Sequence, residues 1–149
     1  MDRTMRGLLA GIIAGVVMNA WNLFDYYFLH ITELRFLDWL AVLLTWARPL
    51  NGFETILYLV LQTIVWDGAL GVGFAHLVVS ITSENIIYKS TLYSIVLWFT
   101  FKVIVNFYHV PVLTAKQSFP GRLSNLLAAI LWGLTLGFVL KKLEKPAEL

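Results

Sequence analysis

Two charged residues lie within long apolar segments, where an ionisable side chain is costly and commonly functional. Asp67 is near the middle of one segment, and Lys102 is near the middle of the next. If these segments are antiparallel helices, the two side chains lie at similar depth, and we expect them to form a buried ion pair. Such a pair either only fixes the register of the helices or opens to bind a proton, an ion or an anionic head group.

A second set of polar residues recurs at helical spacing near the ends of two apolar segments. On a helical wheel, residues 19–33 carry one polar stripe and residues 98–109 carry another. If the stripes face each other, they predict a polar cleft that opens outward. Its candidate members are Asn22, Asp25, Tyr26, His30, Glu33, Asn106 and His109. The alternative is that they form ordinary interhelical hydrogen bonds and interface-level aromatic contacts.

No set of residues identifies an enzyme or a metal site. The sequence has no cysteine, which excludes disulfides, thiolate metal sites, iron–sulfur clusters and a catalytic cysteine. The histidines lack zinc-ligand spacing, and no G-x-S-x-G motif indicates a hydrolase. His30 and His109 have roughly the equal depth that a haem requires, but no flanking sequence supports one. We therefore assign no catalytic residue, no metal site and no cofactor.

The composition is typical of a polytopic membrane protein. Of the 149 residues, 59% are hydrophobic and only 13% are charged, whereas about a quarter of a soluble domain is charged. A cytosolic globular protein is excluded, because the apolar runs are too many and too long for one small core. The net charge of +2 comes from scattered basic residues and a group after the last apolar segment. We therefore expect no nucleic-acid partner.

Four apolar segments are long enough to cross a bilayer, which requires about 20 helical residues. They cover about residues 7–29, 53–79, 89–110 and 123–140 of a single transmembrane domain, residues 1–149. The sequence therefore predicts an all-α fold, an integral membrane four-helix bundle. The first segment has no convincing cleavage site, so we interpret it as a retained span and not as a signal peptide.

A shorter apolar segment, about residues 36–47, separates the first two spans and is too short to cross the membrane. Asp38, Ala41 and Thr45 share one side of its helical wheel, and large apolar residues, among them Trp39 and Leu44, cover the other side. Arg35 and Arg48 bracket it. This pattern predicts a helix that lies in the membrane interface. The alternative is a short core helix folded under the bundle.

Small residues recur at every fourth position of the first and last spans, a spacing that lets helices approach closely in a membrane. The two stripes are Gly7, Gly11 and Gly15, and Ala129, Gly133 and Gly137. We expect both stripes to form helix contacts, within one chain in preference to between chains. The expected partners are membrane lipids, with self-association or other membrane proteins as alternatives.

The distribution of basic residues predicts the orientation of the spans. One side holds Arg3, Arg6, Lys89, Lys141, Lys142 and Lys145, and the other side holds Arg35, Arg48, Lys116 and Arg122. Because the more basic side normally faces the cytoplasm, both termini are predicted to be cytoplasmic. A dual or inverted topology stays an alternative, since the difference is small.

Several features together are similar to a known group of proteins. They are the opening helix Gly7-Leu-Leu-Ala-Gly11-Ile-Ile-Ala-Gly15, a long aromatic outer connection with the string His30-Ile31-Thr32-Glu33, a third span that contains Trp98 and ends near Pro111, and a last span leading into Lys141-Lys142-Leu143-Glu144-Lys145. In these features the chain resembles small uncharacterised four-span bacterial inner-membrane proteins of the YqhR and YagU kind. The resemblance implies a bacterial cell-membrane location, and it supplies no catalytic residues.

Three functions of different classes fit these patterns. The first is a non-enzymatic accessory or assembly subunit that acts through protein or lipid contacts, which the small-residue stripes favour. The second is a small transporter or channel that uses Asp67 and Lys102. The third is a membrane-embedded enzyme or haem protein that acts on a lipid or a quinone and uses Asp25, His30, Glu33 and His109.

Overall fold

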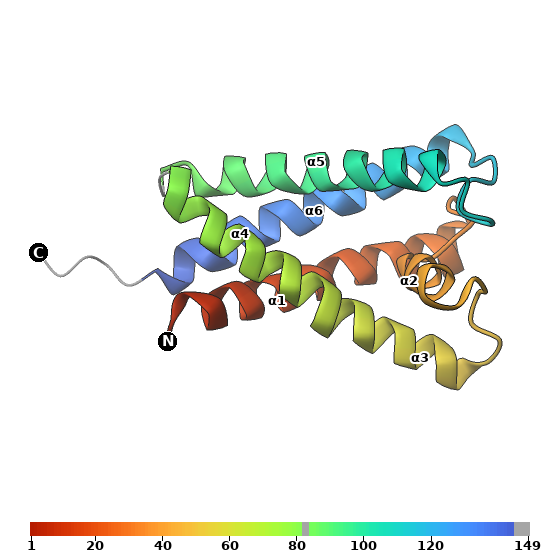
Figure 1. The fold of residues 1–149 in the computed structure, drawn as a ribbon, viewed down its shortest axis with the longest axis horizontal. Coiled ribbons are helices and arrows are strands. Elements are labelled where there is room, and N and C mark those ends of the chain that lie inside the picture. The colour runs from red at the N-terminus through yellow and green to blue at the C-terminus, as the bar shows by residue number, and fades with distance from the viewer. Residues whose placement is uncertain (82–83, 145–149) are drawn as a thin grey trace, which may run out of the picture.

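The computed structural model describes residues 1–81 and 84–144, and most of this length is helical (Figure 1). The elements are α1 (Arg3–Phe24), η1 (Asp25–Leu29), α2 (Phe36–Thr45), α3 (Gly52–Val60), η2 (Leu61–Trp66), α4 (Asp67–Ile81), α5 (Ile86–Phe107) and α6 (Phe119–Leu143), where η denotes a π-helical segment. The predicted all-α class is confirmed. Lys145, used in the orientation argument, lies outside the described residues.

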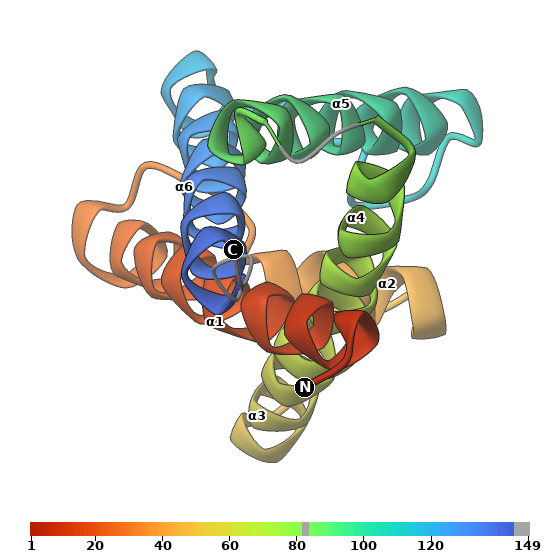
Figure 2. The same cartoon turned by 90° about the vertical axis from the view of Figure 1, so that its left-hand side faces the viewer.

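The four long helices pack in the order α4, α1, α6, α5, and each is in extensive contact with the next. Figure 2 views the molecule from one end, where the four helices form the four sides of a square. The fourth side is different, because α4 and α5 contact each other only slightly. They are adjacent near the connection that joins them and diverge toward the end of the molecule that holds α2 (Figure 1).

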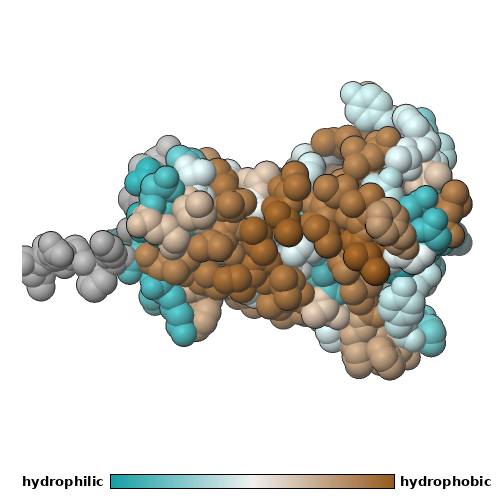
Figure 3. Space-filling view, turned by 90° about the horizontal axis from the view of Figure 1, so that it is seen from below, coloured by the Kyte–Doolittle hydropathy of each residue, from teal (hydrophilic) through white to brown (hydrophobic). Residues whose placement is uncertain are grey.

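Four helical runs are long and apolar enough to cross a membrane. They are Arg3–Leu29, Gly52–Val78, Ile86–Phe107 and Phe119–Leu143, which agree with the four predicted spans to within a few residues. On the face shown in Figure 3, apolar residues cover the middle of the molecule, and hydrophilic residues gather toward both ends. The start of α1, the end of α6, the end of α4 and the start of α5 lie together at one end (Figure 1).

The sequence provides stop and start signals at the helix ends. At the start of α1, the Asp2 side chain accepts a hydrogen bond of 2.7 Å from the Met5 N–H. At the start of α6, the Ser118 hydroxyl accepts one of 3.2 Å from the Gly121 N–H. Pro120 lies in this first turn, where its missing N–H costs nothing. These caps fix where the first and last spans begin.

The first small-residue stripe lies against α4. A Cβ atom added at Gly11 would meet the Asp67 carbonyl oxygen, and one added at Gly71 would meet the Gly7 carbonyl oxygen. Gly15 lies against the Asp67 side chain. The backbones of α1 and α4 therefore touch over two helical turns, a contact that only glycine permits.

The second small-residue stripe lies against α5. The Ser90 hydroxyl donates a hydrogen bond of 2.7 Å to the Gly133 carbonyl oxygen. A Cβ atom at Gly137 would meet the same hydroxyl, and one at Gly133 would meet the Ser94 hydroxyl. Ala129 is buried on the same side of α6. Both stripes thus lie in helix contacts within one chain.

The short helix α2 does not bury only the side that its pattern predicts to be apolar. Asp38 and Ala41 of the polar side are fully buried, and Trp39 of the apolar side is also buried at 4% exposure, whereas Leu44 of the apolar side is 61% exposed. The reason is electrostatic, because Arg35 and Arg48 both bind the Asp38 carboxylate and so make its burial tolerable. With this carboxylate turned inward, α2 covers the end of the bundle.

Candidate functional site, a cavity between diverging helices

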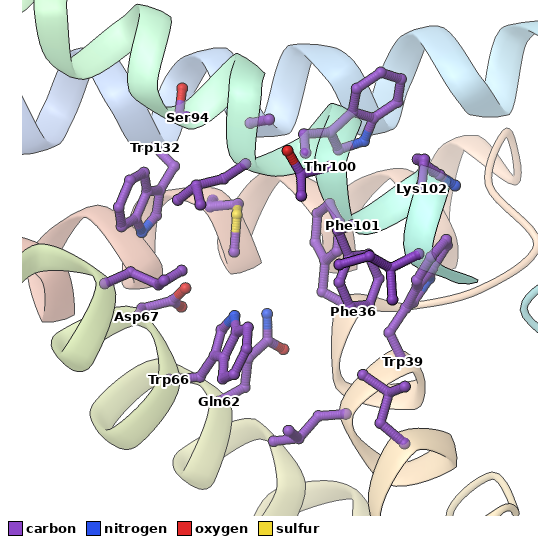
Figure 4. Close-up of a pocket in the computed structure, with 18 residues that line it drawn as sticks. Phe36, Trp39, Gln62, Trp66, Asp67, Ser94, Thr100, Phe101, Lys102 and Trp132 are labelled. Atoms are coloured by element: carbon purple, nitrogen blue, oxygen red, sulfur yellow. The ribbon is translucent and has the colours of Figure 1, made fainter. Parts of the chain in front are cut away.

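A cavity of about 310 Å³ lies where η2 and α4 diverge from α5 (Figure 4). This volume is near the lower end of the range of about 300–1,000 Å³ that is usual for small-molecule sites. Its walls are mostly aromatic and aliphatic, and the aromatic residues are Phe36, Trp39, Trp66, Trp98, Phe101 and Trp132. Trp66 is 47% exposed and Ile104 is 48% exposed. The cavity is therefore open along the side of the bundle, between η2 or α4 and α5.

The π-helical segment η2 brings two polar side chains to one end of this cavity. Gln62 and Asp67 are five residues apart, so they lie on different sides of a regular α-helix. In η2, however, the Asp67 N–H donates to the Gln62 carbonyl oxygen, and this i→i+5 bond places the residues one turn apart. Both side chains line the cavity, beside Trp66 and Trp132 (Figure 4).

The Asp67 carboxylate is buried without a partner. It is 2% exposed, and one oxygen lies against Gly15. Among the described residues no hydrogen bond or ion pair reaches this carboxylate, and Oε1 of the buried Gln62 also has no hydrogen-bond partner. Buried polar atoms in folded proteins are nearly always paired, so these acceptors indicate a place for a ligand or for water.

Three hydrogen-bond donors of the cavity wall are unpaired as well. The indole N–H groups of Trp39, Trp98 and Trp132 are buried and have no partner among the described residues. Ser94, in contrast, is engaged, because its hydroxyl donates 2.8 Å to the Thr91 carbonyl oxygen. The cavity therefore combines apolar walls with a few unsatisfied polar atoms, a combination that is typical of small-molecule sites.

Lys102 also lines the cavity, but the predicted ion pair with Asp67 is not formed. The Lys102 ammonium donates 3.1 Å to Oε1 of Gln117 and lies 3.9 Å from the ring centroid of Trp39. Figure 4 shows Asp67 and Lys102 at opposite ends of the cavity. The physical reason is that α4 packs against α1 through glycine contacts and diverges from α5, so equal depth does not bring the side chains together.

The predicted outer cleft is also absent, because its members are divided between the interior and the surface. Asn22 and Asp25 are buried. The Asn22 Oδ1 atom accepts 2.8 Å from the Phe36 N–H, which ties the start of α2 to α1. The Asp25 carboxylate accepts a hydrogen bond from the Ser124 hydroxyl of α6. These two residues therefore connect elements and do not line a cleft.

The other candidates of the outer cleft lie nearer the surface. His30, Asn106 and His109 are exposed. Both histidines follow the ends of helices with positive φ values, 54° and 50°, so their backbone conformation ends the helices. Within the described part of the chain, no group of His, Cys, Asp or Glu residues could hold a metal ion.

Glu33 joins the connection after η1 to the start of α6. Its Oε1 atom accepts a hydrogen bond of 3.0 Å from the Ser118 N–H. Partial burial acts to raise the pKa of the Glu33 carboxyl, but the hydrogen bonds from the backbone and hydroxyl of Ser118 outweigh it and lower the pKa. Glu33 is therefore ionised, and it links the connection after η1 to the start of α6.

The structure contains a buried charge network at α2 that the sequence patterns did not predict. Asp38 Oδ1 and Oδ2 accept bonds of 2.8 and 3.0 Å from the Arg35 guanidinium, and Arg48 adds one of 3.3 Å. Tyr26, expected in the outer cleft, accepts 3.3 Å from Arg48, and the Tyr27 hydroxyl accepts 2.7 Å from Arg35. Burial acts to lower the pKa of Arg35, but the Asp38 carboxylate outweighs it and raises the pKa. The sequence feature that indicates this network is an acidic residue between two arginines in an apolar segment.

Comparisons with protein-family models, with curated proteins and with solved structures give no match for this chain.

Proposed function

We propose that the chain is a small, non-enzymatic integral membrane protein that binds an amphipathic, lipid-soluble molecule in the cavity between α4 and α5. The observation that carries this proposal is the aromatic cavity, which opens on the side of the bundle and contains unpaired polar atoms. In a bilayer, this side faces lipid. A ligand could therefore enter laterally and place its polar group at the unpaired atoms.

The fold also supports the proposed placement in the membrane, in which the start of α1 and the end of α6 both lie on the cytoplasmic side. The basic residues Arg3, Arg6, Lys89, Lys141 and Lys142 belong to helices at the end that holds the start of α1. At the other end, Arg35 and Arg48 bind Asp38. The resemblance noted in the sequence extends the proposal to the bacterial inner membrane.

Cysteine labelling tests this orientation, and the cysteine-free chain is a clean background. Lys116 is exposed in the α5–α6 connection, and Glu84 is exposed in the α4–α5 connection. A membrane-impermeant maleimide applied to intact cells is expected to label Lys116→Cys and to spare Glu84→Cys until the cells are lysed. The reverse pattern would establish an inverted topology.

Native mass spectrometry of the protein extracted in mild detergent tests the cavity. We expect a bound lipid-soluble molecule to appear as an added mass. Leu97 lines the cavity, and Leu97→Trp should fill it and remove the added mass. Val96→Trp is the matched control, because Val96 is the adjacent residue of α5, is 54% exposed and does not line the cavity.

The outcome separates the proposed function from its competitors. Retention of the added mass in Leu97→Trp would show that the molecule binds elsewhere and would contradict the proposal. Co-purification of a foreign subunit without any small molecule would instead favour the accessory role through protein contacts. The transport hypothesis loses its original basis, since the Asp67–Lys102 pair is not formed.

A further inference from the structure

We propose that the molecule bound in this cavity carries an organic ammonium group, which lies beside the Asp67 carboxylate. This inference rests on the proposed function, and it assigns the chemical class of the ligand. Its basis is the deep end of the cavity, where two unpaired oxygen acceptors and two tryptophans line the same space (Figure 4).

The Asp67 carboxylate lacks a compensating positive charge within the described part of the chain. A buried carboxylate is costly unless a positive group or several hydrogen-bond donors accompany it. Asp67 has neither among the described residues: one of its oxygens lies against Gly15 of α1 and is unpaired, and Lys102 is engaged elsewhere. A ligand with a positive group would satisfy this carboxylate, and the Oε1 atom of Gln62 provides a second acceptor at the same end.

The residues around Asp67 fit an organic cation better than a metal ion. A metal ion such as Ca²⁺ takes about six to eight oxygen ligands, and Mg²⁺ takes about six. This end of the cavity offers the side-chain oxygens of Asp67 and Gln62, next to the rings of Trp66 and Trp132. Aromatic faces attract organic ammonium ions, which are weakly hydrated and bring apolar groups with them. The lining therefore fits an alkyl or aryl ammonium ion.

Lys102 has the same charge as the proposed ligand. Its ammonium group is held at the opposite end of the cavity by Gln117 and Trp39. It therefore disfavours a second positive group at that end. The ligand that fits both ends has one cationic group beside Asp67 and an apolar remainder along the aromatic walls.

A pair of probes of equal shape tests the charge directly. Benzyltrimethylammonium carries a quaternary nitrogen, and neopentylbenzene has a carbon atom in the same place. With the purified protein in lipid nanodiscs, binding can be followed through the fluorescence of the tryptophans that line the cavity. The parent protein is expected to bind the cation at least about tenfold more tightly than its carbon analogue.

Two variants identify the carboxylate that is responsible. Asp67→Asn should abolish this preference while it still binds neopentylbenzene, which shows that the variant is folded and its cavity intact. Asp25→Asn removes another buried carboxylate, one that does not line the cavity, and should keep the preference. Equal affinity of the parent for both probes would overturn the ammonium assignment and leave the lipid-soluble ligand in place. Binding of neither probe would count against the cavity site itself.

Discussion

Replacement of Asp38 by alanine is expected to lower the free energy of unfolding by about 3–5 kcal/mol, the usual cost of breaking a buried ion pair. Asp38 is fully buried, and its carboxylate accepts hydrogen bonds from the backbone and the side chain of Arg35. The variant would leave the buried Arg35 guanidinium without its counter-charge. Unfolding in dodecyl sulfate, followed by tryptophan fluorescence, measures the loss.

Two controls show whether burial is the cause. The side chain of Arg48 is 40% exposed where it contacts Asp38, so Arg48→Gln should cost less than about 1 kcal/mol. The double variant Arg35→Met, Asp38→Leu removes both charges and should be much milder than Asp38→Ala. If the double variant is as unstable as the sum of its own single variants, Arg35→Met and Asp38→Leu, the pair is not coupled.

Gly71→Ala is expected to destabilise the protein by about 3 kcal/mol, although alanine is the better helix former by about 1 kcal/mol. A Cβ atom at this position would meet the carbonyl oxygen of Gly7 and the backbone of Gly11. Backbone atoms cannot rotate away as a side chain can, so α1 and α4 would have to separate. The same unfolding titration measures this effect.

The matched control is Gly73→Ala, two residues along the same helix. There the nearest atom to an added Cβ is the Tyr93 hydroxyl, at an ordinary contact distance of 3.4 Å. We expect this variant to be neutral or stabilised by up to about 1 kcal/mol. A loss in Gly73→Ala equal to that in Gly71→Ala would mean that close backbone packing is not what these glycines provide.

The long elements could be predicted because lipid imposes simple requirements on sequence. An apolar helix that crosses the bilayer needs about 20 residues, and the four spans were found within a few residues of their ends. Glycine at every fourth position indicates close helix packing, and Gly7, Gly11 and Gly15 lie in such a contact. Both signals are local, so one sequence suffices to read them.

The candidate site could be predicted only in part, because it depends on which helices are neighbours. Asp67 and Lys102 stand out in the sequence as charged residues within apolar segments, and both line the cavity. Their pairing was inferred from equal depth alone. The sequence does not show that α4 packs against α1 and diverges from α5. It therefore does not show that a cavity separates the two charged side chains.

Helical wheels failed where the helices are not regular. The wheel assumes a constant rotation per residue, but η1 and η2 contain i→i+5 turns, which change the phase of the side chains that follow. Gln62 and Asp67 share the cavity for this reason, although a regular helix would separate them. The same effect begins at Asp25, within the stripe that predicted the outer cleft.

The divergence of α4 from α5 also gives the molecule the outline of a wedge, wider at the end that holds α2 (Figure 1). In a bilayer, such a protein occupies more area in one leaflet than in the other. A molecule seated between the two helices favours the wide shape, since a ligand stabilises the conformation that binds it better. Lateral tension in that leaflet favours the wide shape too, so tension and ligand occupancy should reinforce each other.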